Sequence, residues 1–125
     1  MYIFVYGTLK KGDPNHARLE GSRFVCATQT IENYVMLDLG AFPGILKPED
    51  ISQMPVSTIT GEIYQISDQT LKELDHYEGE WYYREEVHLE CGFSALMYFL
   101  KKIPPINYKV ITNGNWENKI VEVNS

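Results

Sequence analysis

One helix signal stands among many short β-type segments, and this contrast limits the folds that the chain can adopt. Ser67 and Asp68 are good N-caps, the stretch QTLKELDHYE continues at helical spacing, and Gly79 is a suitable stop. The β-type segments are rich in β-branched and aromatic residues, which are typical of strands. They cover residues 2–6, 23–31, 33–39, 58–66, 81–91 and 93–100. About six strands around one helix predict the α+β class.

Length and charge narrow the function classes. The chain has 125 residues and a net charge of -6. This length predicts a single domain over residues 1–125. The acidic balance argues against a nucleic-acid partner, which needs a basic surface. No apolar run is long enough to span a membrane, and the first positive charges follow the apolar N-terminal stretch, the reverse of a signal peptide. We therefore expect a soluble cytoplasmic protein with no nucleic-acid or membrane partner.

The usual signatures of disulfide, metal and nucleotide sites are weak. Cys26 and Cys91 are too few for a disulfide framework, which favours a reducing compartment. Both fall in predicted strands, so we expect small core side chains that activity does not need. The three histidines are scattered without metal-ligand spacing, and we expect no metal. Gly7 and Gly12 have the spacing of a phosphate-binding loop, but Asp13 follows in place of lysine, so no cofactor is expected.

The helical period places Glu78 on the apolar side of the predicted helix. Leu71 and Leu74 define the inward stripe, and positions 75 and 78 continue it. Burial and the negative end of the helix dipole both raise the pKa of a carboxyl there, toward the range that a general base or acid needs. The alternative is a helix that frays early and leaves Glu78 in solvent. For Asp75 we favour a hydrogen-bonding role that orients the turn.

The first predicted strand ends in the sequence Tyr6-Gly7-Thr8-Leu9. Glycine lets the backbone turn sharply, and the N–H groups of Gly7, Thr8 and Leu9 can then face a ligand. Such a nest suits a carboxylate or a developing oxyanion. A plain strand-to-loop turn is the alternative. The aromatic residues 81–83 are more typical of core packing than of a pocket wall.

Seven short motifs follow one another along nearly the whole chain. They are YGTLKKG at 6–12, PNH at 14–16, FPG at 42–44, TGEIYQI at 60–66, LDHYEG at 74–79, YYR at 82–84 and GNW at 114–116. This ordered set resembles the gamma-glutamylcyclotransferase-like family, and most closely its gamma-glutamylamine cyclotransferase branch. Asn115 stands where the family usually has aspartate.

The resemblance implies a small mixed β-barrel of about six strands flanked by helices, with a cavity beside the YGTL turn. It implies that Glu78, which the helical pattern also singles out, is the catalytic acid–base. The substrate-binding residues that we expect with it are Tyr6, Gly7, Thr8, Leu9 and Tyr82. The implied reaction cyclises the glutamyl part of a small γ-glutamyl substrate to 5-oxoproline and releases the amine or amino acid, without metal or cofactor. We expect a monomer or weak homodimer.

Two other functions stay open at the level of sequence. A non-catalytic small-molecule-binding or interaction module could keep the same barrel, although an inward carboxylate is costly for binding alone. An enzyme could instead act on a γ-glutamyl group carried by a biosynthetic intermediate or a protein. The acidic residues near the predicted site would repel an anionic leaving group, which favours amine-bearing substrates over γ-glutamyl dipeptides.

Overall fold

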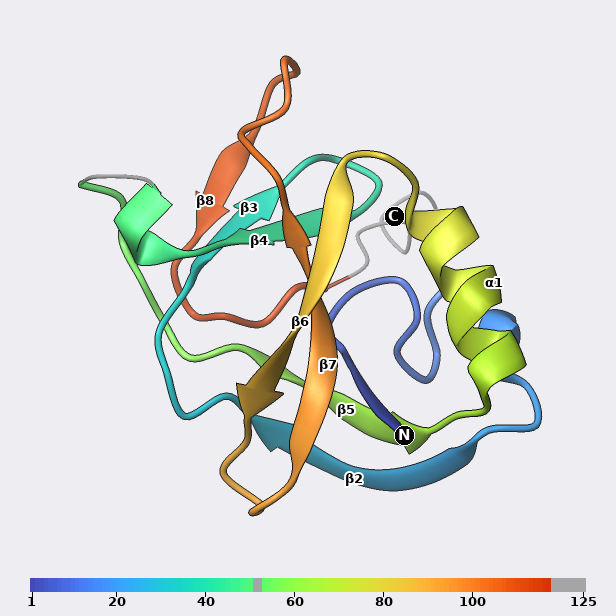
Figure 1. Cartoon of the computed structure of the whole chain (residues 1–125). Helices are drawn as coiled ribbons and strands as arrows, with labels where there is room; N and C mark the ends of the chain where they lie inside the picture. Colours follow the sequence, from blue (N-terminus) through green and yellow to red (C-terminus); the bar gives the residue numbers. More distant parts are fainter. Residues whose placement is uncertain (51–52, 118–125) are drawn as a thin grey trace, which may run out of the picture.

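The computed structural model describes residues 1–50 and 53–117, which form two sheets and one α-helix (Figure 1). The five-stranded sheet has the order β2-β5-β1-β7-β6, and the three-stranded sheet has the order β4-β3-β8. The strands are β1 (Tyr2–Val5), β2 (Arg23–Gln29), β3 (Val35–Asp38), β4 (Pro43–Leu46), β5 (Thr60–Gln65), β6 (Tyr82–His88), β7 (Ser94–Leu100) and β8 (Lys109–Ile111). The helix is α1 (Asp68–Glu78), and two 3-10 turns are η1 (His16–Leu19) and η2 (Pro48–Asp50).

Strand β1 lies in the middle of the larger sheet and is buried on both faces. It pairs antiparallel with β5 and parallel with β7. Ile3 and Val5 point toward one core cluster, while Phe4 and Tyr6 point toward another. Because both faces are covered, the sequence of β1 is a continuous apolar run and does not alternate between apolar and polar residues.

Helix α1 covers one face of the five-stranded sheet, and its predicted limits are confirmed. The Ser67 hydroxyl accepts the Thr70 N–H at 3.1 Å, and Gly79 follows the last turn with a φ of 77°. Leu71 and Leu74 are buried in the cluster that contains the β1 side chains Ile3 and Val5. The stripe predicted from the sequence is therefore the one that faces the sheet.

The three-stranded sheet covers the opposite face. Met36 of β3 and Ile45 of β4 are buried in one cluster with the β7 side chains Met97 and Phe99. The predicted strands 23–31 and 33–39 are confirmed in outline as β2 and β3, which belong to different sheets. Strand β4 lies partly in a segment that we expected to be a loop, because Pro43 and a glycine open it, and the short β8 was not predicted at all.

The α+β class is confirmed, but the predicted barrel is not. In the described residues, neither sheet closes on itself through strand pairing, and β2 and β6 are the two edges of the larger sheet. Just beyond the ends of these two strands, the backbone is joined by an isolated bridge between Thr30 and Leu89. The helical flank consists of α1 and two 3-10 turns. No helix in the described ranges is long and apolar enough to cross a membrane.

The prediction that both cysteines are core residues is wrong for Cys91. Strand β6 ends at His88, so Cys91 falls in the turn before β7 and is exposed. Cys26 of β2 is half-buried and packs against the core. Val87 and Leu89 are buried while Glu86 and His88 are exposed, as in a half-buried strand, but this alternation stops where the turn begins.

Candidate active site

The turn that follows β1 is held in place by contacts with two later segments of the chain. The carbonyl of Thr8 accepts the Asn15 N–H at 3.0 Å, and the Leu9 carbonyl lies 3.0 Å from the His16 ring nitrogen Nδ1. The Lys10 ammonium donates to the carbonyl of Trp116 at 2.8 Å. This last bond joins the YGTLKKG motif to the GNW motif, which lies 106 residues further along the chain. The conformation of the turn therefore depends on residues outside it, one of them near the other end of the described chain.

Gly7 is required by close packing and not by its own backbone conformation. Its φ lies outside the left-handed region, so the sharp turn that we predicted does not demand glycine there. A Cβ on Gly7 would instead lie 2.6 and 2.7 Å from the Cγ and Cδ atoms of Pro43, the first residue of β4. Pro43 is buried, so its ring has little room to yield.

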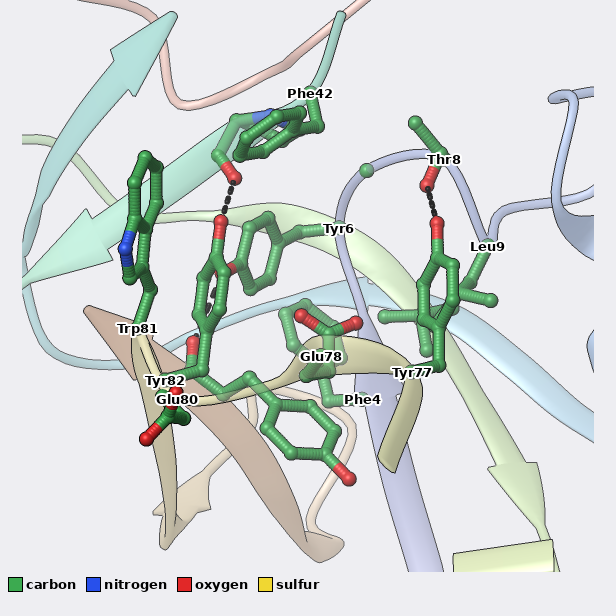
Figure 2. Close-up of a pocket in the computed structure, with 14 residues that line it drawn as sticks. Phe4, Tyr6, Thr8, Leu9, Phe42, Tyr77, Glu78, Glu80, Trp81 and Tyr82 are labelled. Atoms are coloured by element: carbon green, nitrogen blue, oxygen red, sulfur yellow. Dashed lines mark hydrogen bonds between the residues drawn. The ribbon is translucent and has the colours of Figure 1, made fainter. Parts of the chain in front are cut away.

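A pocket of about 460 Å³ opens beside this turn. The six residues that the sequence predicts for the site all line it: Tyr6, Gly7, Thr8, Leu9, Glu78 and Tyr82. Glu78 is the last residue of α1, and Figure 2 shows its carboxylate pointing into the pocket, in this view between Tyr82 and Tyr77. The end of β1, the end of α1 and the start of β6 together bring these residues to one place.

The pKa of the Glu78 carboxyl lies near 7. Burial raises its pKa from an ordinary 4.5 to about 7, the Arg18 guanidinium lowers it in part, and the Asp75 carboxylate raises it again. Arg18 stands 3.9 Å above the centre of the Tyr77 ring, which keeps its charge near the pocket. At pH 7 the carboxyl is therefore divided between its charged and neutral forms, so it can both accept and donate a proton.

The tyrosine hydroxyls of the pocket wall are bound within the protein. Tyr82 donates to the carbonyl of Pro43 at 2.9 Å, and Tyr6 donates to the carbonyl of Tyr98 at the same distance. The hydroxyls of Thr8 and Tyr77 lie 3.3 Å apart (Figure 2). These bonds fix the aromatic rings, so the wall has a set shape before any ligand enters.

Asp75 adopts the orienting role that we favoured for it. Its carboxylate accepts two bonds from Arg84, at 2.9 and 3.1 Å, and the Tyr98 hydroxyl at 2.6 Å. The bonds from Arg84 lower the pKa of Asp75 despite partial burial, and the Tyr98 bond lowers it further. Asp75 therefore stays a carboxylate at neutral pH, and it ties α1 to β6 and β7 one turn before Glu78.

Sequence reasoning missed several of the lining residues. Phe42, Pro43, Tyr77, Glu80, Trp81 and Tyr98 line the pocket as well. The expectation that residues 81–83 are not a pocket wall is correct for Tyr83, whose ring stacks on Phe99. It is wrong for Trp81 and Tyr82, which both line the pocket, and Trp81 is 40% exposed there. Trp81 is the first residue of the predicted strand 81–91, but β6 begins at Tyr82, so strand alternation does not set the direction of the Trp81 side chain. Among the residues that the structure describes, no group of histidine, cysteine or acidic side chains could hold a metal ion.

A pocket lined by aromatic side chains and by a carboxyl whose pKa lies near 7 is typical of a site that binds or converts a small molecule. The comparisons with known proteins identify its family. The family model described as gamma-glutamyl cyclotransferase, AIG2-like, matches residues 3–118. The chain belongs to this family.

Three relatives illustrate the range of the similarity. The gamma-glutamylcyclotransferase family protein YtfP of Escherichia coli K12 is 32% identical over 118 residues, covering 93% of this chain and 96% of the relative. Gamma-glutamylaminecyclotransferase B of Danio rerio is 36% identical over 97 residues, covering 70% of this chain and 49% of the relative. The crystal structure of an AIG2-like protein from Mus musculus has a TM-score of 0.72 at 25% identity, covering 93% of this chain and 87% of that one.

The raised pKa of Glu78 makes a prediction about stability. The folded protein holds this proton up to about pH 7, while the unfolded chain releases it near pH 4.5, so the carboxyl destabilises the fold increasingly as the pH rises between these values. At pH 8, Glu78→Gln should therefore need a higher urea concentration to unfold than the wild type. Its free energy of unfolding should be larger by about 1–3 kcal/mol. At pH 4 the two proteins should differ little. An equal difference at both pH values would contradict a raised pKa.

The two charges beside Glu78 predict opposite shifts of its pKa. Arg18→Gln removes the positive charge and should raise the pKa, while Asp75→Asn removes the negative charge and should lower it. Each shift should be roughly 0.3–1 unit, since both partners are reached by solvent. A carbon-13 NMR titration of the Glu78 carboxyl measures this pKa directly in the wild type and in each variant. Shifts of the same sign in both variants would mean that general loosening, and not charge, moves the pKa.

Proposed function

We propose that the chain is a γ-glutamyl cyclotransferase that converts the glutamyl part of a γ-glutamyl compound into 5-oxoproline and releases an amine. One observation carries this proposal: the Glu78 carboxyl, with a pKa of about 7, lies in the wall of a pocket formed beside the Gly7–Leu9 turn. Membership of the family supports the reaction class. The name of the zebrafish relative supports the release of an amine.

The reaction is an internal acyl transfer. The substrate's α-amine attacks its own γ-carbonyl carbon, so a new C–N bond forms and closes a five-membered ring. The bond from that carbon to the departing nitrogen then breaks, and the amine leaves. The nucleophile belongs to the substrate, so the chemistry requires neither an enzyme nucleophile nor a metal.

Glu78 is the group that moves the proton in this proposal. An α-amine has a reference pKa of about 7.7–8 and is largely protonated at neutral pH. The Glu78 carboxylate takes one proton from the α-ammonium group so that its nitrogen can attack, and the resulting carboxylic acid gives that proton to the departing nitrogen. The ring nitrogen loses a second proton to solvent once the C–N bond has formed, and the released amine takes one up from solvent. A carboxyl with a pKa of about 7 suits both steps better than one near 4.5.

The turn after β1 has the second role. The backbone N–H groups of Gly7, Thr8 and Leu9 bind the substrate's α-carboxylate or the oxyanion that forms on the γ-carbonyl oxygen. The fixed rings of Tyr6 and Tyr82 hold the glutamyl chain in a folded conformation close to the ring that it forms. Holding such a conformer supplies several kcal/mol of the barrier, up to about 7–11 in ideal cases.

Acidic and aromatic residues at the pocket favour an uncharged or cationic leaving group. Glu80 is exposed and lines the pocket two residues after Glu78, so an anionic leaving group would meet two acidic side chains. Phe42 and Trp81 line the same pocket, with ring centres 6.5 Å apart, and they offer an apolar surface to the leaving amine. This favours γ-glutamyl amines over γ-glutamyl dipeptides.

A substrate panel tests the proposal. The purified chain is incubated with a γ-glutamyl amine, a γ-glutamyl dipeptide and glutathione, and both 5-oxoproline and the released amine are measured. We expect the two products in equal amounts, with the γ-glutamyl amine turned over fastest. Binding of these compounds without any turnover would support a binding module instead. Neither binding nor turnover of any of the three compounds would support an enzyme that acts on a γ-glutamyl group carried by a biosynthetic intermediate or a protein.

A further inference from the structure

Two thiols lie together at a place where the edges of the five-stranded sheet approach each other. The Sγ atoms of Cys26, in β2, and Cys91, in the turn between β6 and β7, are 3.3 Å apart. Strands β2 and β6 are the outermost strands of this sheet. The pair therefore spans the opening between its two edges, and 65 residues separate the cysteines along the chain.

The backbone on both sides of this opening is already joined by hydrogen bonds. The Glu90 N–H donates to the carbonyl of Gln29 at 2.9 Å, and the Ile31 N–H donates to the carbonyl of His88 at 3.1 Å. The Gln29 side chain also donates to the Glu90 carboxylate at 2.9 Å. The folded chain thus holds the end of β2 against the β6–β7 turn, so the closeness of the thiols does not depend on their own weak hydrogen bond.

We propose that Cys26 and Cys91 are a redox site that forms a reversible disulfide and covalently joins the two edges of the five-stranded sheet. A disulfide needs its sulfurs about 2.05 Å apart, so the pair must close by roughly 1.3 Å. Cys91 lies in an exposed turn that can make this small adjustment. This site is separate from the proposed function, because the pocket meets β6 at Tyr82, the other end of the strand.

The surroundings of the two thiols give them different roles. At Cys91, burial opposes the charged form, but hydrogen bonds from the Phe93 backbone, the Cys26 thiol and the Thr28 side chain outweigh it and lower the pKa. Burial and the bond to Cys91 raise the pKa of Cys26 to about 11. Cys91 is therefore the attacking thiolate, and Cys26 is the thiol that resolves the intermediate.

The oxidant in this proposal is a small-molecule disulfide. The Cys91 thiolate attacks one of its sulfurs, forms a mixed disulfide and releases the first thiolate. Cys26 then loses its proton and attacks the Cys91 sulfur, which releases the second thiolate. Two protein thiols lose two electrons in total, and the oxidant gains them as two thiols once its thiolates are protonated.

The test uses the full chain and 2-hydroxyethyl disulfide, which has no γ-glutamyl group for the pocket to bind. Oxidation is followed by intact mass, peptide mapping and thermal melting. We expect the wild type to lose two hydrogen atoms, to show a Cys26–Cys91 peptide and to stay a single chain. Its Tm should rise by roughly 8–16 °C over the reduced form, because the crosslink restricts a long segment of the unfolded chain.

Serine variants separate the two roles. Cys26→Ser should accumulate a stable mixed disulfide on Cys91, while Cys91→Ser should react more slowly, and the double variant should show no Tm change with oxidant. Four results in the wild type would overturn the proposal: retention of both thiols, a persistent mixed disulfide, a crosslink between two chains, or an oxidised form that melts below the reduced one. None of these readouts depends on cyclotransferase activity, so the proposed function and this site can fail independently.

Discussion

Glu78→Gln should lower the turnover of a γ-glutamyl amine by roughly 10²–10⁴, the range that general acid–base catalysis contributes. Glutamine keeps the size and the hydrogen-bonding capacity of the side chain but cannot carry a proton between the two nitrogens. Ligand affinity should survive, because the proposed grip on the substrate comes from the Gly7–Leu9 backbone. Steady-state formation of 5-oxoproline, together with calorimetric binding of 5-oxoproline itself, measures both quantities.

The matched control for this variant is Glu73→Gln. Glu73 lies on the same helix, has the same side chain and is exposed, with Gln69 as its hydrogen-bond partner. It should keep nearly full turnover. A Glu78→Gln enzyme with near-normal turnover would show that both the helical pattern and the family resemblance misled us about this residue. Loss of folding in Glu78→Gln would also contradict the expected gain in stability at pH 8.

Gly7→Ala should cost about 1–3 kcal/mol of stability and should weaken binding of a γ-glutamyl ligand as well. A turn that only presents its backbone N–H groups to a ligand would predict a binding defect with little loss of stability. The structure changes this prediction, because the new Cβ meets the buried ring of Pro43 at 2.6 Å. Pro43 also accepts the Tyr82 hydroxyl, so displacing its ring disturbs the pocket wall. Urea unfolding and calorimetry provide the two measurements.

A double-mutant cycle tests the cause of this loss. Pro43→Ala removes the Cγ and Cδ atoms that the added Cβ would meet. Gly7→Ala should therefore cost less stability in the Pro43→Ala background than in the wild type. An equal cost in both backgrounds would mean that the strain arises in the Gly7 backbone and not at the proline. Thr8→Ser, which keeps the hydroxyl that faces Tyr77, should have only a mild effect on either quantity.

Local patterns were sufficient to predict the limits of the helix and the inward direction of Glu78. An N-cap, an apolar stripe and a terminal glycine all lie within one segment, and helical geometry converts them directly into limits and directions. The central strand β1 was also predictable, because a strand that is buried on both faces has a continuous apolar sequence. Strand β4 was missed because Pro43 and Gly44 are typical of loops, and only its pairing with β3 makes it a strand.

The rest of the pocket depends on contacts between distant segments. Phe42 and Trp81 are 39 residues apart, and each lies just before a strand, where no periodicity fixes a direction. The moderating charge of Arg18 reaches Glu78 from η1, about 60 residues earlier in the chain. The predicted barrel is not confirmed for a similar reason. Strand composition shows how many strands a chain can form, but not whether the two outer strands pair.

The pH dependence of kcat/KM for a γ-glutamyl amine tests most directly whether Glu78 is the proton acceptor. This ratio reports the ionisations of the free enzyme and the free substrate. We predict an acid limb with a single ionisation near pH 7, because protonated Glu78 cannot accept the amine proton. The residual activity of Glu78→Gln should lack that limb. A wild-type rate that shows no acid limb between pH 5 and 7, or an acid limb that persists in Glu78→Gln, would contradict the assignment of Glu78 as the base.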